Sequence, residues 1–255
     1  MDDDNGQKKI KSIERMFDIV EYISEQPPAG VTELSQELGI SKGNVHAYLC
    51  TLEKLGYIVN MDGNYRLGLE YLRHGIKARN TYERYPLINQ KVTHLAEETG
   101  ERVWAQVEEN GMAYYLCGAK GEHPIQPPVQ VGERVPIHQI AAGKAILSCM
   151  EEERIEEIID RHGLPAATEN TITDPAELFE ELDRIRKRGY ALNREESLEG
   201  LHAVGAPIQS QGEDVYGALS ISGPANRLTE SRIESEFSEL LLGAVNELEI
   251  NLTYG

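Results

Sequence analysis

The chain has 255 residues, with 43 acidic against 25 basic side chains and a formal net charge of -18. This length allows two domains with separate cores, and no internal repeat is visible. No stretch approaches the roughly eighteen apolar residues of a membrane span, and the start, MDDDNGQKK, is acidic where a signal peptide would be basic and then apolar, so we expect a cytoplasmic protein without membrane contact.

The first predicted helix spans Ile10 to Ser24, where apolar residues recur at helical spacing until Pro27-Pro28-Ala29-Gly30 ends the pattern. Two further helical patterns follow in residues 32–55, separated by a break at Gly39. Thr32 and Ser41 stand at the expected N-cap positions of these helices, where a side-chain oxygen can accept from free backbone amides. Helix, turn and helix therefore follow one another.

The second of these helices should run from about Lys42 to Leu55. After it, two short alternating segments flank Met61-Asp62-Gly63-Asn64, which is a hairpin signal. Any helical pair buries leucines at this spacing, but the added hairpin favours a winged helix-turn-helix that inserts its second helix into the major groove of double-stranded DNA. The residues predicted to contact DNA are Thr32, Ser41, Lys42, Asn44, His46, Tyr48 and Arg66.

The acidic charge lies almost wholly outside this DNA reader. Residues 8–80 carry a net charge of +1, whereas residues 81–255 carry -16. An acidic surface with few lysines is typical of proteins from a high-salt cytoplasm, and an ordinary acidic protein is the alternative. In high salt, attraction to phosphates is screened, so base contacts and dimeric docking would supply more of the affinity.

After the reader, a helical pattern over residues 70–84 predicts a linker helix. The remainder, residues 85–255, is predicted to be an antiparallel α+β domain with helices packed on a sheet. We expect helices at residues 92–98, 142–148, 151–161, 175–188 and 229–252, and strands at residues 102–108, 112–117, 201–208 and 215–222.

The sequence offers no convincing catalytic, metal or cofactor site. Cys50, Cys117 and Cys149 are odd in number, far apart and set in apolar patterns, which favours reduced, mostly buried thiols over disulfides or zinc. Gly143-Lys144 lacks the Ser or Thr and the first Gly of a phosphate loop. Neighbouring acids such as Glu195-Glu196 are expected by chance among so many carboxylates.

One strand has a composition that suits a binding pocket. Along residues 215–222, Ala218, Ser220 and Ser222 share one face, while Leu219 and Ile221 share the other. Two hydroxyls on a small-residue face could bind a ligand, although strand serines more often face water.

Several segments resemble IclR-type transcription regulators, and in family order they cover nearly the whole chain. The effector-domain segments are VPIHQIAAGKAIL at 135–147, GYALNREESLEGLHAVGAPI at 189–208 and GALSISGP at 217–224; the reader resembles the family through ISKGNVHAYLCTLEKLGYIV and YRLGL. The resemblance implies a winged helix-turn-helix at 8–69, a linker helix at 70–84, and a GAF-like domain at 85–255 that binds a small-molecule effector. It also implies a homo-oligomer, either a dimer or a dimer of dimers.

By the same resemblance, the effector pocket is predicted to involve residues from three separate segments. Backbone amides near Ala142 would lie at a helix start, which favours an anion. Asn193 and Ala203 depart from relatives that carry an acid and a cysteine there, so the ligand is expected to differ; we expect a small organic or sugar-derived acid. The predicted pocket residues are Val135, Ala141, Ala142, Asn193, Ala203, Ser220 and Ser222.

The DNA reader departs from the family too. Gly43 and Asn44 replace a serine and a threonine, and Ala47 replaces an arginine that would contact phosphate. The leading hypothesis is a transcription regulator whose operator binding is controlled by the effector. The alternatives are a metabolite-processing enzyme with a GAF-like domain and a DNA-binding scaffold that needs no ligand.

Overall fold

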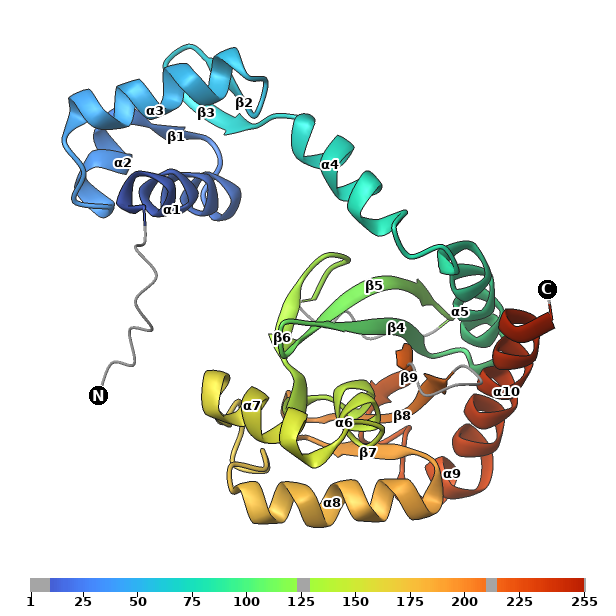
Figure 1. Cartoon of the computed structure of the whole chain (residues 1–255). Helices are drawn as coiled ribbons and strands as arrows, with labels where there is room; N and C mark the ends of the chain where they lie inside the picture. The colour runs from blue at the N-terminus through green and yellow to red at the C-terminus, as the bar shows by residue number, and fades with distance from the viewer. Residues whose placement is uncertain (1–9, 123–128, 210–214, 255) are drawn as a thin grey trace. The chain divides into compact units, whose positions relative to one another are not determined.

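A computed structural model describes residues 10–122, 129–209 and 215–254 (Figure 1). The chain divides into two compact units, Met1–Thr81 and Tyr82–Gly255. No helix within the described ranges is long and apolar enough to cross a membrane.

The N-terminal unit is a helix-turn-helix followed by a hairpin, which confirms the predicted fold. Its sheet is antiparallel in the order β1-β3-β2. Fully buried Ile19, Leu34, Val45 and Leu49 join its helices in one core. The elements are α1 (Lys11–Glu25), β1 (Ala29–Gly30), α2 (Val31–Glu37), α3 (Lys42–Lys54), β2 (Ile58–Met61), β3 (Asn64–Leu67) and α4 (Glu70–Arg79).

One of the two predicted N-caps is wrong. The N-cap of α2 is Gly30, two residues before the predicted Thr32, which lies inside the helix; the Glu33 carboxylate accepts from the Gly30 amide at 3.4 Å. Ser41 does cap α3, because its Oγ accepts from the Asn44 amide at 3.4 Å. The sequence signal failed at Thr32 because glutamate from within the helix supplies the acceptor.

The hairpin turn follows from two residues. Asp62 and Gly63 have positive φ angles of 55° and 89°, the backbone that a two-residue hairpin needs and that Asp-Gly adopts readily. Strand β1 was not predicted, since two residues carry no alternation; Ala29 pairs with Tyr65 across it. The predicted linker helix is shorter than expected, because α4 ends at Arg79.

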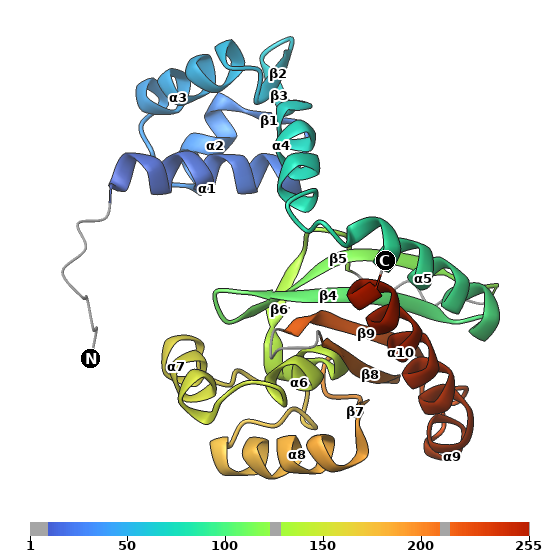
Figure 2. The same cartoon turned by 45° about the vertical axis from the view of Figure 1, so that its right-hand side comes forward.

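The C-terminal unit is built on a six-stranded antiparallel sheet in the order β6-β5-β4-β9-β8-β7. Figures 1 and 2 show α5 and α10 on one side of the sheet and α6, α7 and α8 on the other. Its elements are α5 (Tyr85–Thr99), β4 (Arg102–Glu109), β5 (Met112–Lys120), β6 (Arg134–Pro136), α6 (Ala141–Leu147), α7 (Glu152–His162), α8 (Pro175–Arg188), β7 (Ala191–Arg194), β8 (Leu201–Gln209), β9 (Val215–Pro224), α9 (Glu230–Arg232) and α10 (Ser238–Tyr254).

Alternation along β9 divides the two cores, as predicted. Leu219 and Ile221 pack toward α5 and α10, whereas Ala218 joins the core formed with α6, α7 and α8. Every residue of α6 is buried, so this short helix lies directly against the sheet. Strands β6 and β7 were not predicted, because both are short edge strands.

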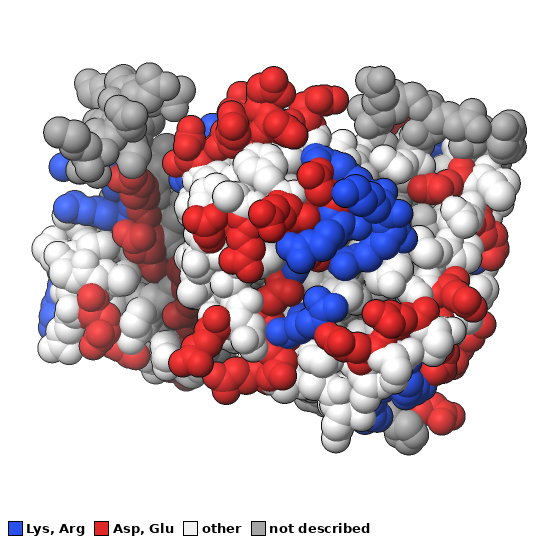
Figure 3. Space-filling model, turned by 90° about the horizontal axis from the view of Figure 1, so that it is seen from below, with Lys and Arg blue, Asp and Glu red and all other residues white. Residues whose placement is uncertain are grey.

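On the face seen in Figure 3, acidic side chains are scattered widely, and the largest group of basic side chains is compact. Helix α8 ends in Arg186, Lys187 and Arg188, which suit the negative end of the helix dipole. Arg186 pairs with Asp183 at 2.9 Å and Arg188 with Glu181 at 2.6 Å. Local ion pairs and the helix dipole therefore explain why arginines gather at the end of α8.

Candidate functional sites

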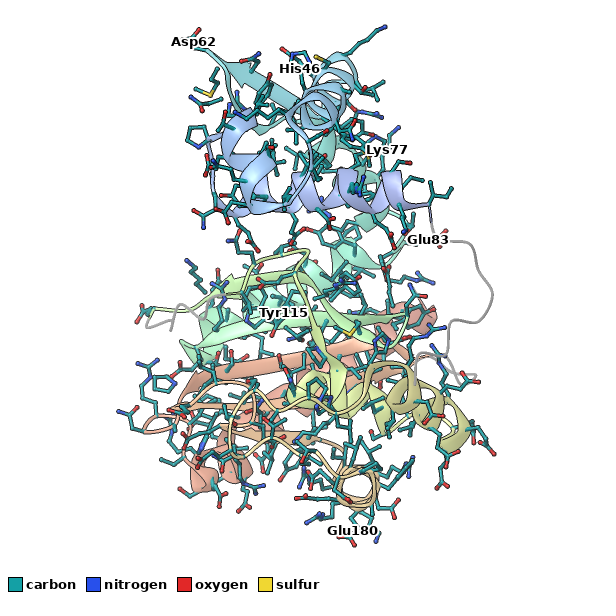
Figure 4. All side chains as sticks on the ribbon, turned by 90° about the vertical axis from the view of Figure 1, so that its left-hand side faces the viewer. His46, Asp62, Lys77, Glu83, Tyr115 and Glu180 are labelled. Atoms are coloured by element: carbon teal, nitrogen blue, oxygen red, sulfur yellow. The ribbon has the colours of Figure 1, made fainter. Side chains whose placement is uncertain are left out.

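Helix α3 carries four of the seven residues predicted to contact DNA, and three of these four are exposed. Lys42, Asn44 and His46 are exposed, whereas Tyr48 is half-buried against the core of the unit. Figure 4 shows His46 on α3 and Asp62 at the tip of the hairpin on the same side of the unit. Helix and hairpin thus present one surface.

This surface carries few positive charges. Arg66 is exposed on β3, and its Nη1 donates to the Leu67 carbonyl at 3.0 Å. Thr32 is exposed on α2, and Ser41 is used as the cap of α3. Asp62 adds a negative charge at the hairpin tip, where it would repel a phosphate.

Cys50 corrects one sequence expectation, since it is exposed rather than buried. Its Sγ lies 3.5 Å from His46 Nδ1, one turn away on α3. Cys117 is buried and Cys149 half-buried, as the apolar patterns indicated. Among the described residues, no group of three metal-ligating side chains could hold an ion.

A cavity of about 120 Å³ lies beside the start of α6, on the face of the sheet that carries Ser220 and Ser222. Among the described residues that line it, none is charged. Six of the seven residues predicted for the pocket line it: Val135, Ala141, Asn193, Ala203, Ser220 and Ser222. Nine more were not indicated by the sequence: Trp104, Gln106, Tyr115, Val129, Gln139, Ile140, Ser197, Leu198 and Leu201.

Ala142 is the predicted pocket residue that the structure does not bring to the cavity. It is fully buried, and its backbone nitrogen faces β8, where a Cβ on Gly205 would lie only 2.6 Å away. Gly205 is therefore needed for α6 to approach the sheet closely.

The polar floor of the cavity is a hydrogen-bonded group. Gln106 Nε2 donates to Ser220 Oγ at 3.0 Å, and Gln106 also bonds the Tyr115 phenol. Burial, and then the charge of Glu133, raise the pKa of Tyr115 to about 12, so its phenol stays neutral near pH 7. Ser222 Oγ donates to the Arg102 carbonyl at 3.4 Å.

Asn193 holds the cavity wall together. Its Nδ2 donates to the Gln139 carbonyl at 2.8 Å and to Ser197 Oγ at 3.0 Å, while its Oδ1 accepts from the Glu196 amide at 3.0 Å. Both amide hydrogens are thus used within the protein. Ser197 Oγ is the acceptor in its bond with Asn193, and no acceptor for its own hydrogen lies among the described residues, so the hydroxyl could donate to a ligand.

Trp104 forms another wall. Its ring lies 4.9 Å from that of Tyr115 in an edge contact, and the Arg102 guanidinium lies 4.1 Å from its centroid. Trp104 pairs with Gly118 on β5, where a Cβ would lie 2.1 Å from the indole ring. A glycine is therefore needed at position 118 to leave room for the tryptophan ring, and the sequence alone did not reveal this requirement.

Behind the wall lies a buried ion pair between Lys144 of α6 and Glu196. Their side chains are 1% and 9% exposed. Burial lowers the pKa of Lys144, and the Glu196 carboxylate opposes this shift. Thr171 Oγ1 donates to the Glu196 carbonyl at 2.6 Å. No feature of the sequence singles out Glu196, yet its ion pair and backbone hydrogen bond hold the segment that carries Ser197 in place.

His138 and His202 have structural partners. His138 Nε2 bonds the Pro165 carbonyl at 3.1 Å, and His202 Nδ1 bonds the Leu228 carbonyl at 2.8 Å. Burial, assisted by the charge of Lys144, lowers the pKa of His138, and the bond to Pro165 opposes it. Neither histidine lines the cavity.

Comparison with known proteins bears on both units. Two family models match: "IclR helix-turn-helix domain" over residues 12–60 and "Bacterial transcriptional regulator IclR C-terminal" over residues 86–249. The "Probable HTH-type transcriptional regulator ArcR" of Halobacterium salinarum is 31% identical over 253 residues, which cover 97% of this chain and 96% of the relative. The "Transcriptional repressor IclR" of Escherichia coli is 29% identical over 252 residues, which cover 97% and 91%.

Solved structures share the fold over nearly the full length. The IclR of Thermotoga maritima has a TM-score of 0.80 and 29% identity, covering 96% of this chain and 100% of that one. An IclR homolog from Microbacterium hydrocarbonoxydans, complexed with 4-hydroxybenzoate, has a TM-score of 0.77 and 19% identity, covering 94% and 98%.

Proposed function

This chain belongs to the IclR family of DNA-binding transcriptional regulators, and we propose that it releases or engages its operator in response to a small organic acid held in the C-terminal cavity. The observation that carries the proposal is the cavity itself, with hydroxyls from Ser197, Ser220 and Ser222 and no carboxylate among its described lining residues. Hydroxyl groups can hydrogen-bond a ligand carboxylate, and no carboxylate among the described lining residues would repel it.

The size of the cavity supports a small effector. At about 120 Å³ it is somewhat smaller than the roughly 150 Å³ engineered cavity that takes up benzene. Acids of a few carbons fit this volume, and an aromatic acid would require the walls to move slightly. The structure in complex with 4-hydroxybenzoate, and an inducer-binding domain from Acinetobacter in complex with 3-hydroxybenzoic acid, support a carboxylic acid as the ligand class.

We propose that the DNA contacts come from α3 and the hairpin. Lys42, Asn44 and His46 are the exposed candidates for bases and phosphates, and Arg66 for a phosphate. With so few cations on this surface, one reader would hold DNA weakly, and two readers on one operator would multiply the affinity.

An exposed apolar stripe on the N-terminal unit supports a homodimer. On α1, Phe17 and Ile13 are 56% and 47% exposed; on α4, Leu72 and Ile76 are 58% and 41% exposed. Helical spacing puts each pair on one face. We propose that a second copy of the chain covers these faces. Light scattering would compare the molecular mass of the wild type with that of an Ile13→Glu, Leu72→Glu double variant, which should be smaller. An equal mass for the two proteins would oppose the proposal.

The acidic surface supports activity in concentrated salt. The relative from Halobacterium salinarum and the net charge of -18 point the same way. We expect the free energy of unfolding to rise between low salt and molar KCl, because the ions screen repulsion among carboxylates. A fall would oppose the proposal.

The effector proposal is tested by calorimetry against a panel of small acids, followed by operator binding with and without the acid that binds. A Ser220→Ala, Ser222→Ala double variant should lose at least tenfold in affinity for the acid and keep its operator affinity without ligand. Unchanged affinity for the acid would refute the pocket. Turnover of the bound acid would instead favour an enzyme, and a silent panel with intact DNA binding would favour a ligand-independent scaffold.

A further inference from the structure

Arg102 stands out among the arginines of the C-terminal unit. Others, such as Arg188 and Arg227, hold carboxylates at 2.6 and 2.8 Å. For Arg102 the described residues supply no such carboxylate, and its Nε is buried without a hydrogen-bond partner among them. A half-buried guanidinium with an unused donor is costly unless an acceptor arrives.

The register of the sheet puts this cation beside the cavity. Arg102 lies directly opposite Ser222 on β9, and Ser222 lies opposite Ala203 on β8. Opposite residues in an antiparallel sheet point to the same face, about 5 Å apart at Cβ. Ser222 and Ala203 both line the cavity, so Arg102 begins at its edge.

The guanidinium also lies along β4 over Trp104, a residue that lines the cavity. Trp104 is two residues further on, hence on the same face, and the guanidinium carbon lies 4.1 Å from its ring centroid. Trp104 in turn is held against Gly118 and Tyr115. This stacking restricts the arginine to one position without using its hydrogen-bond donors.

We infer that Arg102 is the residue that selects an acidic effector: its guanidinium, held on Trp104, donates to the carboxylate of a ligand whose other end lies among Ser220, Gln106 and Tyr115. This rests on the proposed effector pocket and adds its charge specificity. The cavity lining alone is neutral and would bind an acid and its amide with similar strength. Arg102 supplies the difference between them.

The test compares each acid with its own amide. The full-length protein is titrated calorimetrically with lactate, butyrate and 4-hydroxybenzoate, and with lactamide, butyramide and 4-hydroxybenzamide. Wild type should prefer at least one acid over its amide by about 10- to 100-fold, and Arg102→Gln should remove that preference by weakening the acid alone. Arg102→Lys should keep part of it, since it retains charge but not the planar fork.

Arg161→Gln, which removes an exposed arginine on α7, is the matched control and should change neither ligand. Because the acid-to-amide ratio is taken within one protein, a smaller folded fraction does not mimic the result. An unchanged ratio in Arg102→Gln would overturn the inference while leaving the pocket intact. If no acid bound the wild type, the proposed acid effector would fail as well.

Discussion

Replacing Lys144 with Met should destabilise the C-terminal unit severely. The change removes the cation that faces Glu196, whose side chain is only 9% exposed. Among the described residues, the hydrogen bond that remains to that carboxylate comes from the Arg194 amide at 3.3 Å. A buried charge that loses its partner costs about 3–5 kcal/mol, a large part of the roughly 5–15 kcal/mol that stabilises a typical domain.

The measurement is urea denaturation followed by circular dichroism, with the midpoint and slope fitted separately for each variant. Arg154→Met is the control in the same unit. Arg154 is 42% exposed and pairs with Glu157, which is 68% exposed, and at 3.4 Å with Glu108, which is 19% exposed. Because the guanidinium is open to water, losing these pairs should cost only about 0.2–1 kcal/mol each. A Lys144→Met, Glu196→Leu double variant should recover most of the loss, because no buried charge then remains unpaired.

Two results would refute this reasoning. One is a Lys144→Met variant no less stable than Arg154→Met, which would mean that water or a protonated Glu196 relieves the charge. The other is a double variant as unstable as Lys144→Met, which would make packing of the lysine chain, and not charge, the cause.

Four further predictions concern single residues. Asn44→Ala should weaken specific DNA binding by about 1–3 kcal/mol and random DNA less, as gel-shift titration would show; equal losses would exclude base reading. Asp62→Lys should strengthen binding to specific and to random DNA. The plot of the logarithm of the binding constant against the logarithm of salt concentration should become steeper by about one phosphate contact. An unchanged slope of this plot would mean that the hairpin tip does not approach the DNA backbone. Burial lowers the pKa of His138, so below about pH 6.5 the unfolded chain binds a proton at this residue more readily than the folded chain does. The free energy of unfolding should therefore fall as the pH drops below that value. His138→Gln should show a smaller fall between pH 7 and 5, and an equal fall would mean that other groups cause it. Gly118→Ala should cost about 1–3 kcal/mol in thermal unfolding and weaken ligand binding, because the new Cβ displaces Trp104; wild-type values for both would show that the indole ring moves aside freely.

Local features of the fold could be predicted from sequence because they depend on near neighbours. The helical spacing in α3, the Ser41 cap and the Asp62-Gly63 turn are each complete within a few residues. The alternation along β9 likewise placed Ser220 and Ser222 on one face. Strand β1 escaped prediction because a strand of two residues is defined only by its partner.

The cavity was predictable only in part, since its contacts join distant segments. Gln106 and Ser220 are 114 positions apart and Lys144 and Glu196 are 52 apart, and no periodicity links either pair. Asn193 was predicted as a pocket residue by resemblance, yet its amide is used by neighbouring protein groups. Sequence proximity to a pocket does not show which atoms are free to bind a ligand.

The two departures from the family at the cavity act differently, since one removes a charge and the other opens space. Where the resemblance led us to expect an acid, Asn193 removes a negative charge from the wall and uses its amide to position Ser197. Where it led us to expect a cysteine, Ala203 leaves space beside Ser222, in the same row of the sheet as Arg102. The nearby Glu196 carboxylate is neutralised by Lys144. In a chain with 43 acidic residues, the described walls of this cavity therefore present hydroxyls and amides with an unpaired guanidinium beside them, which is an environment that favours an anionic ligand.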